Sequence, residues 1–589
     1  MSDELIIHAA QGTLLALQWA PRALALAAGK GWLPQVAAAG PSGAAVTAAP
    51  AASPAPAANP VLTAPPTAAP TAPRTTPGTT PTTAATSEFP TILLSSLIWA
   101  ALLAAVVILF LPERTKEQRD RIRIVGLAGA GVSLFLAAVA VNYEIAQDLL
   151  GGEVSFEEVH SWITSLPVHV DYHVAADGIS LPLLLLSTLV FAAALVASWR
   201  VERRTKLYVV LLLLLETGVN GSLCAFDYVL LLLFLGLEIV PLFLLIAVWG
   251  GEDRMRAAWR WLCMSTLSWA LLLAAILLIG FKGGQGNFTF LQINGAGGSG
   301  VVLTGGIATA AFWLCFAACA IRLPIVPVHT WFRGAVSTSS PPVAAIIAGI
   351  STTMGGYLLL RVVLPGFPAA AHRFSLPIAL LAVLTALWGA VAALAQDDVR
   401  RLLAYAGLSQ MSLVLLAVAA QSSIALNGAV LQLVAHGLSS AMLLLLAGGL
   451  EERARTRSIT RLGGLAWQMP RFTLFWMIAG LSAIGVPFLA GFAAEFQVFL
   501  GSYPAHRVAT VVVMAATLVS TGAVLWMLQR VFFGPAREAF ARVRDAGTLE
   551  LLYLVPMVVA LIAFGMFVGR VMPMINNGVQ LITARLSGG

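Results

Sequence analysis

The chain has 589 residues, of which 59% are apolar and only 10% are charged. Soluble domains carry about 25% charged residues, so this composition excludes an ordinary soluble protein. The net charge of +7 does not indicate nucleic-acid binding, because the basic residues fall in short loops between apolar segments, as in membrane proteins.

The first 88 residues precede the apolar segments. Residues 1–34 are weakly apolar, and three interpretations stay open for them: an amphipathic helix, a poor signal sequence or an extra span. Residues 35–88 are almost all Ala, Pro, Thr, Gly and Ser, which predicts a disordered or polyproline-like tether. We expect a transmembrane domain over 89–575 and a C-terminal tail over 576–589.

The transmembrane domain is predicted from the length of its apolar segments. A bilayer core needs about 20 apolar residues per helix. Segments of suitable length lie at 91–112, 122–142, 178–198, 206–225, 227–249, 259–281, 302–323, 339–362, 375–396, 400–420, 426–449, 472–502, 506–531 and 549–571. The expected fold is therefore an all-α polytopic membrane protein of about 14 transmembrane helices.

Prolines interrupt two of the predicted spans. Pro324 and Pro327 follow the apolar part of the seventh span, and Pro487 lies inside the twelfth. Because proline removes a backbone N–H and frees carbonyls, we expect helices 7 and 12 to be broken. Breaks in corresponding positions suggest two inverted five-helix repeats, helices 4–8 and 9–13.

The charges of the loops predict the orientation. Alternate loops are rich in Arg and Lys: PERTKEQRDRIR, RVERRTK, GGEDRMRAAWR, DDVRR, EERARTRSITR and GPAREAFARVRD. The intervening loops are neutral or acidic, such as YEIAQDLLGGEVSFEEVH. Since cytoplasmic loops carry the excess of basic residues, we expect the Arg-rich loops on the cytoplasmic side.

Five ionisable residues fall well inside predicted spans. They are Glu216 in helix 4, Glu238 in helix 5, Arg322 at the break of helix 7, His436 in helix 11 and Glu495 beyond the break of helix 12. Intramembrane ionisable groups usually face a bundle interior or a wet cavity and mark ion pathways. These residues are therefore candidates for a proton path.

A structural role is the alternative for several of these groups. Arg322 could cap free carbonyls at the helix break, and a neutral His436 could hydrogen-bond to a neighbouring helix. Glu216 and Glu495 could each belong to a structural ion pair. Glu238 could carry protons only if something offsets the roughly 2.5–3.5 kcal/mol that a charged side chain costs at a bilayer centre on insertion scales.

Other charged residues near the span ends have simpler expected roles. Arg361 and Arg530 are expected to extend to the membrane interface. Asp397 and Asp398 precede the tenth span, where an acidic N-terminal cap is sufficient explanation.

The sequence contains no recognisable cofactor motif. Cys224, Cys263, Cys315 and Cys319 lie in apolar spans and lack the CxxC spacing of metal sites. No phosphate-binding glycine loop, dinucleotide fingerprint or nucleophile motif is visible either. We expect the chain itself to bind no NADH, flavin or iron–sulfur cluster.

Several segments resemble the M-type, antiporter-like membrane subunit of the proton-pumping NADH:quinone oxidoreductase, complex I. These segments are YHVAADGISLPL (172–183), PLFLLIAVWGG (241–251), RLPIVPVHTW (322–331), DDVRRLLAYAGLSQMS (397–412), LQLVAHGLSSA (431–441) and GFAAEFQVFLGSY (491–503). The resemblance covers about residues 89–570. It implies a proton path made of a glutamate on helix 5, lysines on helices 7 and 8, histidines on helices 10 and 11, and a charged residue on helix 12.

Three of the implied positions are kept in this chain. His436 matches the helix-11 histidine, Glu495 matches the helix-12 charged residue, and Glu216 matches a further family carboxylate on helix 4. The kept groups His436 and Glu495 both belong to the second repeat.

Four implied positions are altered. The family glutamate stands five residues before the proline of PLFLLIAVWGG, which is Gly236 here, and Glu238 is about 200° away around an ideal helix. The helix-7 lysine matches Arg322, which does not readily deprotonate. The helix-8 lysine matches Thr353, and the helix-10 histidine matches Gln410.

The resemblance leaves three functions open. The first is a proton-translocating subunit of a complex I-type enzyme, with a rerouted path through Glu216, Glu238, His436 and Glu495. The second is a structural subunit with a degenerate channel, and the third is a related subunit of a membrane-bound hydrogenase or a multisubunit cation/proton antiporter.

In the complex I case, the resemblance implies that NADH, FMN, iron–sulfur clusters and quinone belong to partner subunits. Neighbouring antiporter-like subunits and the lipid bilayer would be the partners of this chain. The composition, biased to Ala, Leu, Arg and Pro, favours a bacterial inner membrane.

Overall fold

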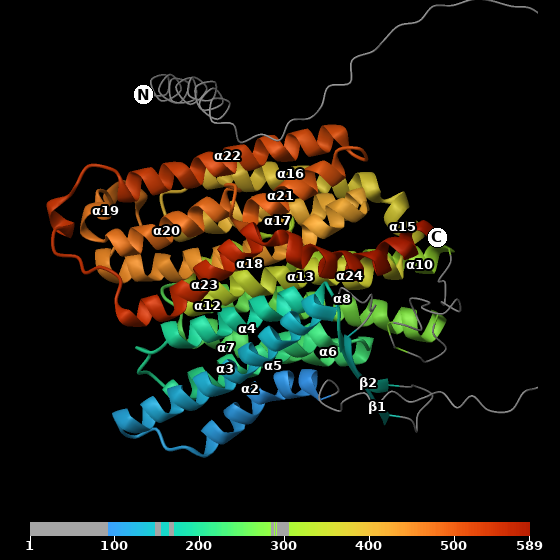
Figure 1. The fold of residues 1–589 in the computed structure, drawn as a ribbon, viewed down its shortest axis with the longest axis horizontal. Coiled ribbons are helices and arrows are strands. Elements are labelled where there is room, and N and C mark those ends of the chain that lie inside the picture. The colour runs from blue at the N-terminus through green and yellow to red at the C-terminus, as the bar shows by residue number, and fades with distance from the viewer. Residues whose placement is uncertain are drawn as a thin grey trace, which may run out of the picture. The chain divides into compact units, whose positions relative to one another are not determined.

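A computed structural model describes residues 92–147, 155–163, 170–283, 288, 290 and 305–588 (Figure 1). The predictions for 1–34 and 35–88 lie outside these residues. Among the described residues, thirteen helices are long and apolar enough to cross a membrane. The expected fourteenth span, 472–502, is divided into two shorter helices, α20 (Pro470–Ala483) and α21 (Ala490–Ser502), as its internal proline predicts. The expected fold of about 14 transmembrane helices is confirmed.

The first part of the chain forms the spans shown in blue and green in Figure 1. Their bounds are α2 (Leu93–Phe110), α3 (Lys116–Gln147), α4 (Ser180–Ala197), α5 (Thr205–Cys224), α6 (Tyr228–Leu237), α7 (Ile239–Trp249), α8 (Arg254–Leu278), α10 (Gly305–Arg322), α11 (Thr330–Thr338), α12 (Pro341–Ile346), α13 (Thr352–Leu358), α14 (Leu364–Gly366) and α15 (Pro368–Arg373). Two π-helical turns, Ile347–Ser351 and Leu359–Val363, join α12 to α13 and α13 to α14.

The second part forms the spans shown in yellow to red. Their bounds are α16 (Ser375–Leu394), α17 (Val399–Ala420), α18 (Ser423–Ala454), α19 (Leu465–Gln468), α20, α21, α22 (Arg507–Phe532), α23 (Thr548–Met566) and α24 (Val568–Gly588). Figure 1 shows most of the blue and green helices on one side and most of the yellow and orange helices on the other, with α12, α13 and α18 between them. Most of the residues 576–589, the expected C-terminal tail, belong to α24.

The seventh and twelfth predicted spans, 302–323 and 472–502, are broken in the same way, as predicted. In α10 the last turn closes with hydrogen bonds from Leu323 N to Cys319 O (2.8 Å) and from Ile325 N to Ala320 O (2.9 Å). The end of α20 has the same pattern, from Ile484 N to Gly480 O (3.1 Å) and from Val486 N to Leu481 O (3.0 Å). The two breaks are therefore equivalent local structures, one in each repeat.

Burial separates inner helices from outer ones. The span formed by α12–α14 is 100% buried, and α17 and α18 are each 94% buried over their apolar windows. Only 33% of the corresponding windows of α8 and α23 is buried. Because the outer helices expose large apolar side chains, their outer faces suit contact with lipid or with other apolar helices.

Aspartates cap the starts of two helices, α17 and α6. Asp398 caps α17 by accepting hydrogen bonds from the backbone N–H groups of Arg400 (2.9 Å) and Arg401 (3.1 Å), as predicted. Asp227 caps α6 in the same way. A two-stranded antiparallel hairpin, β1 (Ser155–Ile163) and β2 (Val170–Ala176), was not expected from the sequence.

The prediction that Arg361 extends to the membrane interface is wrong. Its side chain is buried, and Nη1 lies 2.7 Å from Oδ2 of Asp177, at the start of α4. The guanidinium also stacks 4.0 Å from the ring centroid of Phe226. A buried cation needs a partner, and Arg361 finds one 184 residues away in the sequence. The pair therefore joins the π-helical turn Leu359–Val363 to the start of α4. Arg530 is exposed, as expected.

Candidate proton path

Glu238 and Arg322 form a buried ion pair in the first repeat. Arg322 Nη1 lies 2.9 Å from Glu238 Oε2, and both side chains are less than a tenth exposed. Glu238 and Gly236 face different neighbours, as their spacing predicts, and the predicted helix 227–249 is interrupted at Glu238 itself. Pro241 cannot donate to the carbonyl of Leu237, so the helix is weakened at this turn.

Gly236 faces a different neighbour. A Cβ atom at Gly236 would lie 3.2 Å from Nε1 of Trp269, on α8. The same indole N–H donates to the carbonyl of Leu232 (2.8 Å) and so fixes the ring in this place. The position that matches the family glutamate is therefore covered by Trp269, and Glu238 is the carboxylate that meets the cation at 322.

Glu216 is fully buried on α5. Neither of its carboxylate oxygens has a hydrogen-bond partner among the residues that the structure describes. The structural alternative, an ion pair of Glu216, is not formed within these residues. An isolated buried carboxylate is costly to charge.

The centre between the two repeats is closed by close packing. Thr353 turns its hydroxyl back to its own helix and donates to the carbonyls of Gly349 and Ile350. A Cβ at Gly349 would lie 2.6 Å from the carbonyl oxygen of Gly437, on α18. The π-helical turn Ile347–Ser351 and α18 therefore cross backbone to backbone at these two glycines.

The second repeat gathers polar groups around His436. Its ring lies 3.3 Å from Oγ of Ser440, one turn further along α18. Gly407, on α17, leaves room for the imidazole, since a Cβ there would be 3.0 Å from His436 Cε1. The hydrogen bonds of the ring among the described residues are thus to its own helix, and the structural alternative for His436, a bond to a neighbouring helix, stays a prediction.

An amide chain connects three helices next to this histidine. Gln432 Nε2 donates to Gln410 Oε1 (3.0 Å), and Gln410 Nε2 donates to the carbonyl of Ala483 (3.0 Å), the last residue of α20. Gln410 therefore caps the broken end of α20, and its amide is also within hydrogen-bonding reach of Glu495. An amide can pass on hydrogen bonds but does not titrate.

Glu495 projects from α21 back towards the break between α20 and α21. A Cβ at Gly485 would lie 2.5 Å from Glu495 Oε2, so the carboxylate packs directly on this glycine. Gly485 has a φ of +72°, which is easy only for glycine. A glycine at 485 is thus required both by the turn and by the carboxylate.

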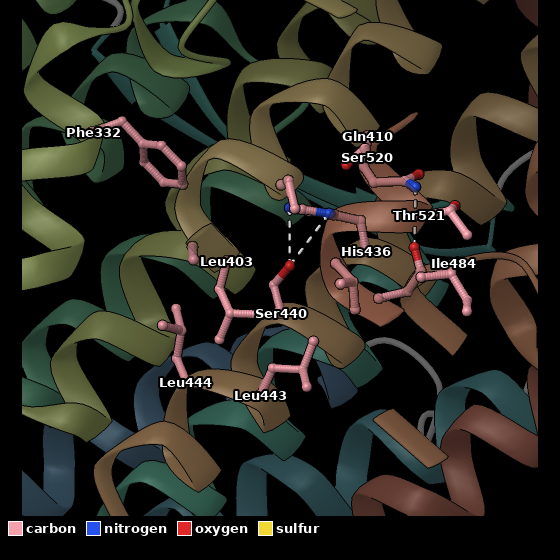
Figure 2. A pocket seen from close by; sticks show the side chains of 15 residues that line it. Phe332, Leu403, Gln410, His436, Ser440, Leu443, Leu444, Ile484, Ser520 and Thr521 are labelled. Carbon is pink, nitrogen blue, oxygen red and sulfur yellow. Dashed lines mark hydrogen bonds between the residues drawn. The ribbon is translucent and has the colours of Figure 1, made fainter. Parts of the chain in front are cut away.

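Two small cavities flank His436. One, of about 20 Å³, is lined by His436, Ser440 and Gln410 together with Ser520 and Thr521 of α22 (Figure 2). The other, of about 10 Å³, is lined by His436, Gln410, Gln432 and Glu495 among others. A polar cavity of about 10–15 Å³ is roughly the size that holds one water molecule. The cavities therefore offer water-sized steps between His436 and Glu495.

The sequence-predicted residues thus form two groups. Glu238 and Arg322 meet in the first repeat, and His436, Gln410 and Glu495 meet in the second, while Glu216 contacts neither group through a recorded hydrogen bond. The predictions missed Ser440 and Gln432. Both lie one helical turn from His436, and this i±4 spacing could have identified them.

No metal centre competes with this interpretation within the described part of the chain. Among those residues, no three His, Cys, Asp or Glu side chains lie close enough together to hold a metal ion.

Comparison with known proteins identifies the family. Residues 225–521 match the family described as "NADH:quinone oxidoreductase/Mrp antiporter, TM". The NAD(P)H-quinone oxidoreductase chain 4 of Picosynechococcus sp. is 32% identical over 79% of this chain and 87% of its own length. Subunit M of the NADH-quinone oxidoreductase of Rhodobacter capsulatus is 30% identical over 75% of this chain and 88% of its own length.

Solved structures agree with this assignment. A chain of respiratory complex I from Thermus thermophilus superimposes with a TM-score of 0.73, at 26% identity, over 83% of this chain and 99% of that chain. A chain of the Mrp complex from Dietzia sp. reaches the same TM-score at 21% identity, over 83% and 97% of the two chains, and so shares the fold. The chain described here is a multi-pass membrane protein and belongs to the NADH:quinone oxidoreductase/Mrp antiporter family of membrane subunits.

Proposed function

We propose that this chain is the M-type subunit in the membrane arm of a complex I-type NADH:quinone oxidoreductase, and that it moves protons through its second repeat. The parent complex is supported by relatives named subunit M and chain 4, which it matches over most of their length. The proposal that the chain moves protons rests on one cluster of polar side chains around water-sized cavities, at the break between α20 and α21. The cluster consists of His436, Gln410, Gln432 and Glu495.

The cluster contains the groups that a proton relay needs. His436 and Glu495 can each gain and lose a proton, while Gln410 and Gln432 hold the hydrogen-bonded geometry between them. The imidazole and the carboxylate line one small cavity, and the carboxylate packs on Gly485, so a small change at Gly485 would alter their separation.

Coupling would need only a modest free energy per proton. Moving one proton against about 100 mV requires about 2.3 kcal/mol. A conformational change driven by electron transfer could supply it, provided that two states of the cluster differ in proton affinity.

The first repeat would act differently. Arg322 does not deprotonate in proteins, and its contact with Glu238 holds that carboxylate in a buried ion pair. With Trp269 over Gly236 and the glycine crossing at 349 and 437, this repeat has the features of a static support.

The redox chemistry belongs to other subunits in this proposal. NADH, FMN, the iron–sulfur clusters and quinone would be bound by partner chains, and this chain would have no active site of its own. The membrane would be a bacterial inner membrane, as in the bacterial relatives.

A structural subunit with a degenerate channel is the second candidate. The observation in its favour is the closed centre, where the π-helical turn Ile347–Ser351 meets α18 at Gly349 and Gly437. The Thr353 hydroxyl there donates to carbonyls of its own helix. Such a subunit would hold its neighbours in register without conducting.

The proton-to-electron ratio of the purified complex in sealed proteoliposomes distinguishes the two. Glu495→Gln keeps the size and hydrogen-bonding capacity of the side chain but removes its charge, and we expect it to lower the ratio or to block coupled turnover. Glu538→Gln, at an exposed glutamate outside the spans, is the matched control and should behave as the native complex. An unchanged ratio and rate in Glu495→Gln would show that the subunit is structural.

A further inference from the structure

A large cavity opens at the end of the bundle that carries the Arg-rich loops. Its volume is about 600 Å³, and it is lined by both repeats, from the end of α4 to the start of α23. Space for a water molecule in the liquid is about 30 Å³, so this cavity can hold a cluster of many waters. The loop charges place it on the cytoplasmic side.

The wall of this cavity next to helices α17 and α18 is ionic. Arg400 is only 2% exposed; it donates to the carbonyl of Ser339 (2.8 Å) and pairs with Glu451 (2.8 Å). Arg457 contacts the other oxygen of Glu451 (2.7 Å). The Nε atom of Arg400 has no hydrogen-bond partner among the described residues, although it is buried. Such groups favour water at this depth.

A stripe of residues leads from this wall to the relay. On α17, Arg400, Leu403, Gly407 and Gln410 recur every three or four residues and therefore share one face. The ten residue-to-residue steps from Arg400 to Gln410 span about 15 Å along the helix.

The facing helix carries a matching stripe. On α18, the residues Glu451, Leu444, Ser440 and His436 likewise share one face. Arg400 and Glu451 join the two stripes at the cavity end, and Gly407 and His436 join them at the relay end.

The small cavity beside His436 continues this seam. Its lining includes Leu403 and Leu444 as well as Ser440 and His436. Figure 2 shows the Ser440 hydroxyl between the His436 ring and these two leucines. Leu403 lies one turn along α17 from Arg400, so the two leucines lie between the level of the water-sized site and the level of Arg400.

We propose that His436 receives its proton from the cytoplasm along the seam between α17 and α18, and that Leu403 and Leu444 are its hydrophobic gate. This inference rests on the proposed function and names the uptake route of the same relay. A short apolar constriction that wets and dries is a known way to gate a pore. The route bypasses Gly236, Arg322 and Thr353, so the altered residues of the first repeat do not block it.

The transfer needs only water and the hydroxyl of Ser440. A water in the wetted seam gives a proton to Ser440 Oγ, and Ser440 gives its own hydroxyl proton to the imidazole. The O–H bond of that water breaks and a new O–H bond forms at Ser440, while the old one is replaced by N–H at His436. The hydroxide that remains takes a proton from the cytoplasmic water, so atoms and charge balance.

Cysteine accessibility tests the route independently of pumping. Leu444→Cys in the full complex should be alkylated by a small membrane-impermeant thiol reagent added on the cytoplasmic side. Leu415→Cys, at a fully buried leucine of α17 outside the seam, is the matched control. We expect Leu444→Cys to react on the order of tenfold faster, which corresponds to about 1.4 kcal/mol in the free energy of local opening.

Mass spectrometry of the labelled site avoids interference from the native cysteines, of which Cys263 is exposed. Equal rates at the two positions, or labelling of Leu444→Cys only from the opposite side, would overturn the proposed route.

A second variant asks whether the seam carries protons. Leu403→Trp should fill the gate and slow proton uptake, while Leu403→Met, which keeps the side-chain volume nearly constant, should not. If Glu495→Gln reduces pumping but Leu444→Cys stays unreactive, the proposed function stands and this route is wrong. If Leu444→Cys reacts but Glu495→Gln and Leu403→Trp leave pumping unchanged, both the proposed function and the role of the seam are wrong.

Discussion

At the scale of residues, the buried ion pair of Glu238 and Arg322 is the clearest case of charged groups that hold the structure and do not titrate. Removing one partner of a buried pair leaves an unpaired charge, which typically costs about 3–5 kcal/mol, whereas replacing both is often neutral. We therefore expect Arg322→Met alone to lower the thermal stability of the complex strongly, and the double variant Glu238→Gln/Arg322→Met to recover most of the loss. The measurement is a double-mutant cycle of unfolding midpoints. Additive losses would show that the two side chains do not depend on each other.

His173, in strand β2, provides a residue-scale test outside the membrane spans. Burial, including packing against Phe226, lowers the pKa of His173, and the bond to Glu157 (2.9 Å) offsets this only in part. A lowered pKa in the folded state gives stability that is present above about 6.5 and is lost as pH falls through the folded value. We expect the protection factors of amide hydrogen exchange in 170–176, which correct for the intrinsic pH dependence of exchange, to fall as pH drops below about 6.5. The variant His173→Gln should lose this fall in protection, and an equal fall in it would contradict the assignment.

Sequence reasoning reached single residues unevenly. The chemical types at 216, 322, 436 and 495 indicated a path because charge inside an apolar span is unusual. The partners of Arg361 and Arg322 were out of reach, because Asp177 and Glu238 are distant in sequence and only packing brings them together. The helix is also interrupted at Glu238, for which Pro241 was the available signal.

At the scale of elements, the crossing of the π-helical turn Ile347–Ser351 and α18 is fixed by the small size of Gly349 and Gly437. A Cβ at Gly349 would come 2.6 Å from Gly437 O and 2.9 Å from Ala441 Cβ. We expect Gly349→Ala to destabilise the subunit by about 1–3 kcal/mol, as overpacking commonly does, and to lower the yield of assembled complex. Gly334→Ala, in α11, is the matched control, because a Cβ there meets nothing within 4 Å. Similar yields and melting temperatures for both variants would show that the crossing is not tight.

Most elements follow from simple sequence rules. Apolar length gave the spans, proline gave the two breaks, and Asp398 gave the start of α17. The two π-helical turns next to α13 did not follow from these rules; at the first of them, Thr352 and Thr353 donate their hydroxyls to the carbonyls of Ala348 and Gly349. The hairpin β1–β2 was missed because its strands are held by tertiary contacts, such as the hydrogen bonds of Ser95 to Glu158 and to Tyr172 (2.8 Å).

At the scale of the whole molecule, the two repeats have the same architecture but different chemistry. The first contains a fixed cation in a buried pair, and the second contains two titratable groups beside water-sized cavities. The altered positions alone predicted a damaged relay. In the proposed route the second repeat is approached from the cavity at the Arg-rich end of the bundle, so loss of the first relay would not by itself end conduction.

The proton-to-electron ratio of the double variant Glu238→Gln/Arg322→Met in sealed proteoliposomes, measured beside Glu495→Gln, tests this division most directly. The double variant removes both charges of the first repeat without leaving either unpaired, and Glu495→Gln removes the one carboxylate of the second relay. We predict that the double variant keeps the native ratio, while Glu495→Gln loses the share that this subunit contributes. A loss in the double variant together with a native ratio in Glu495→Gln would contradict the account and return the proton path to the first repeat.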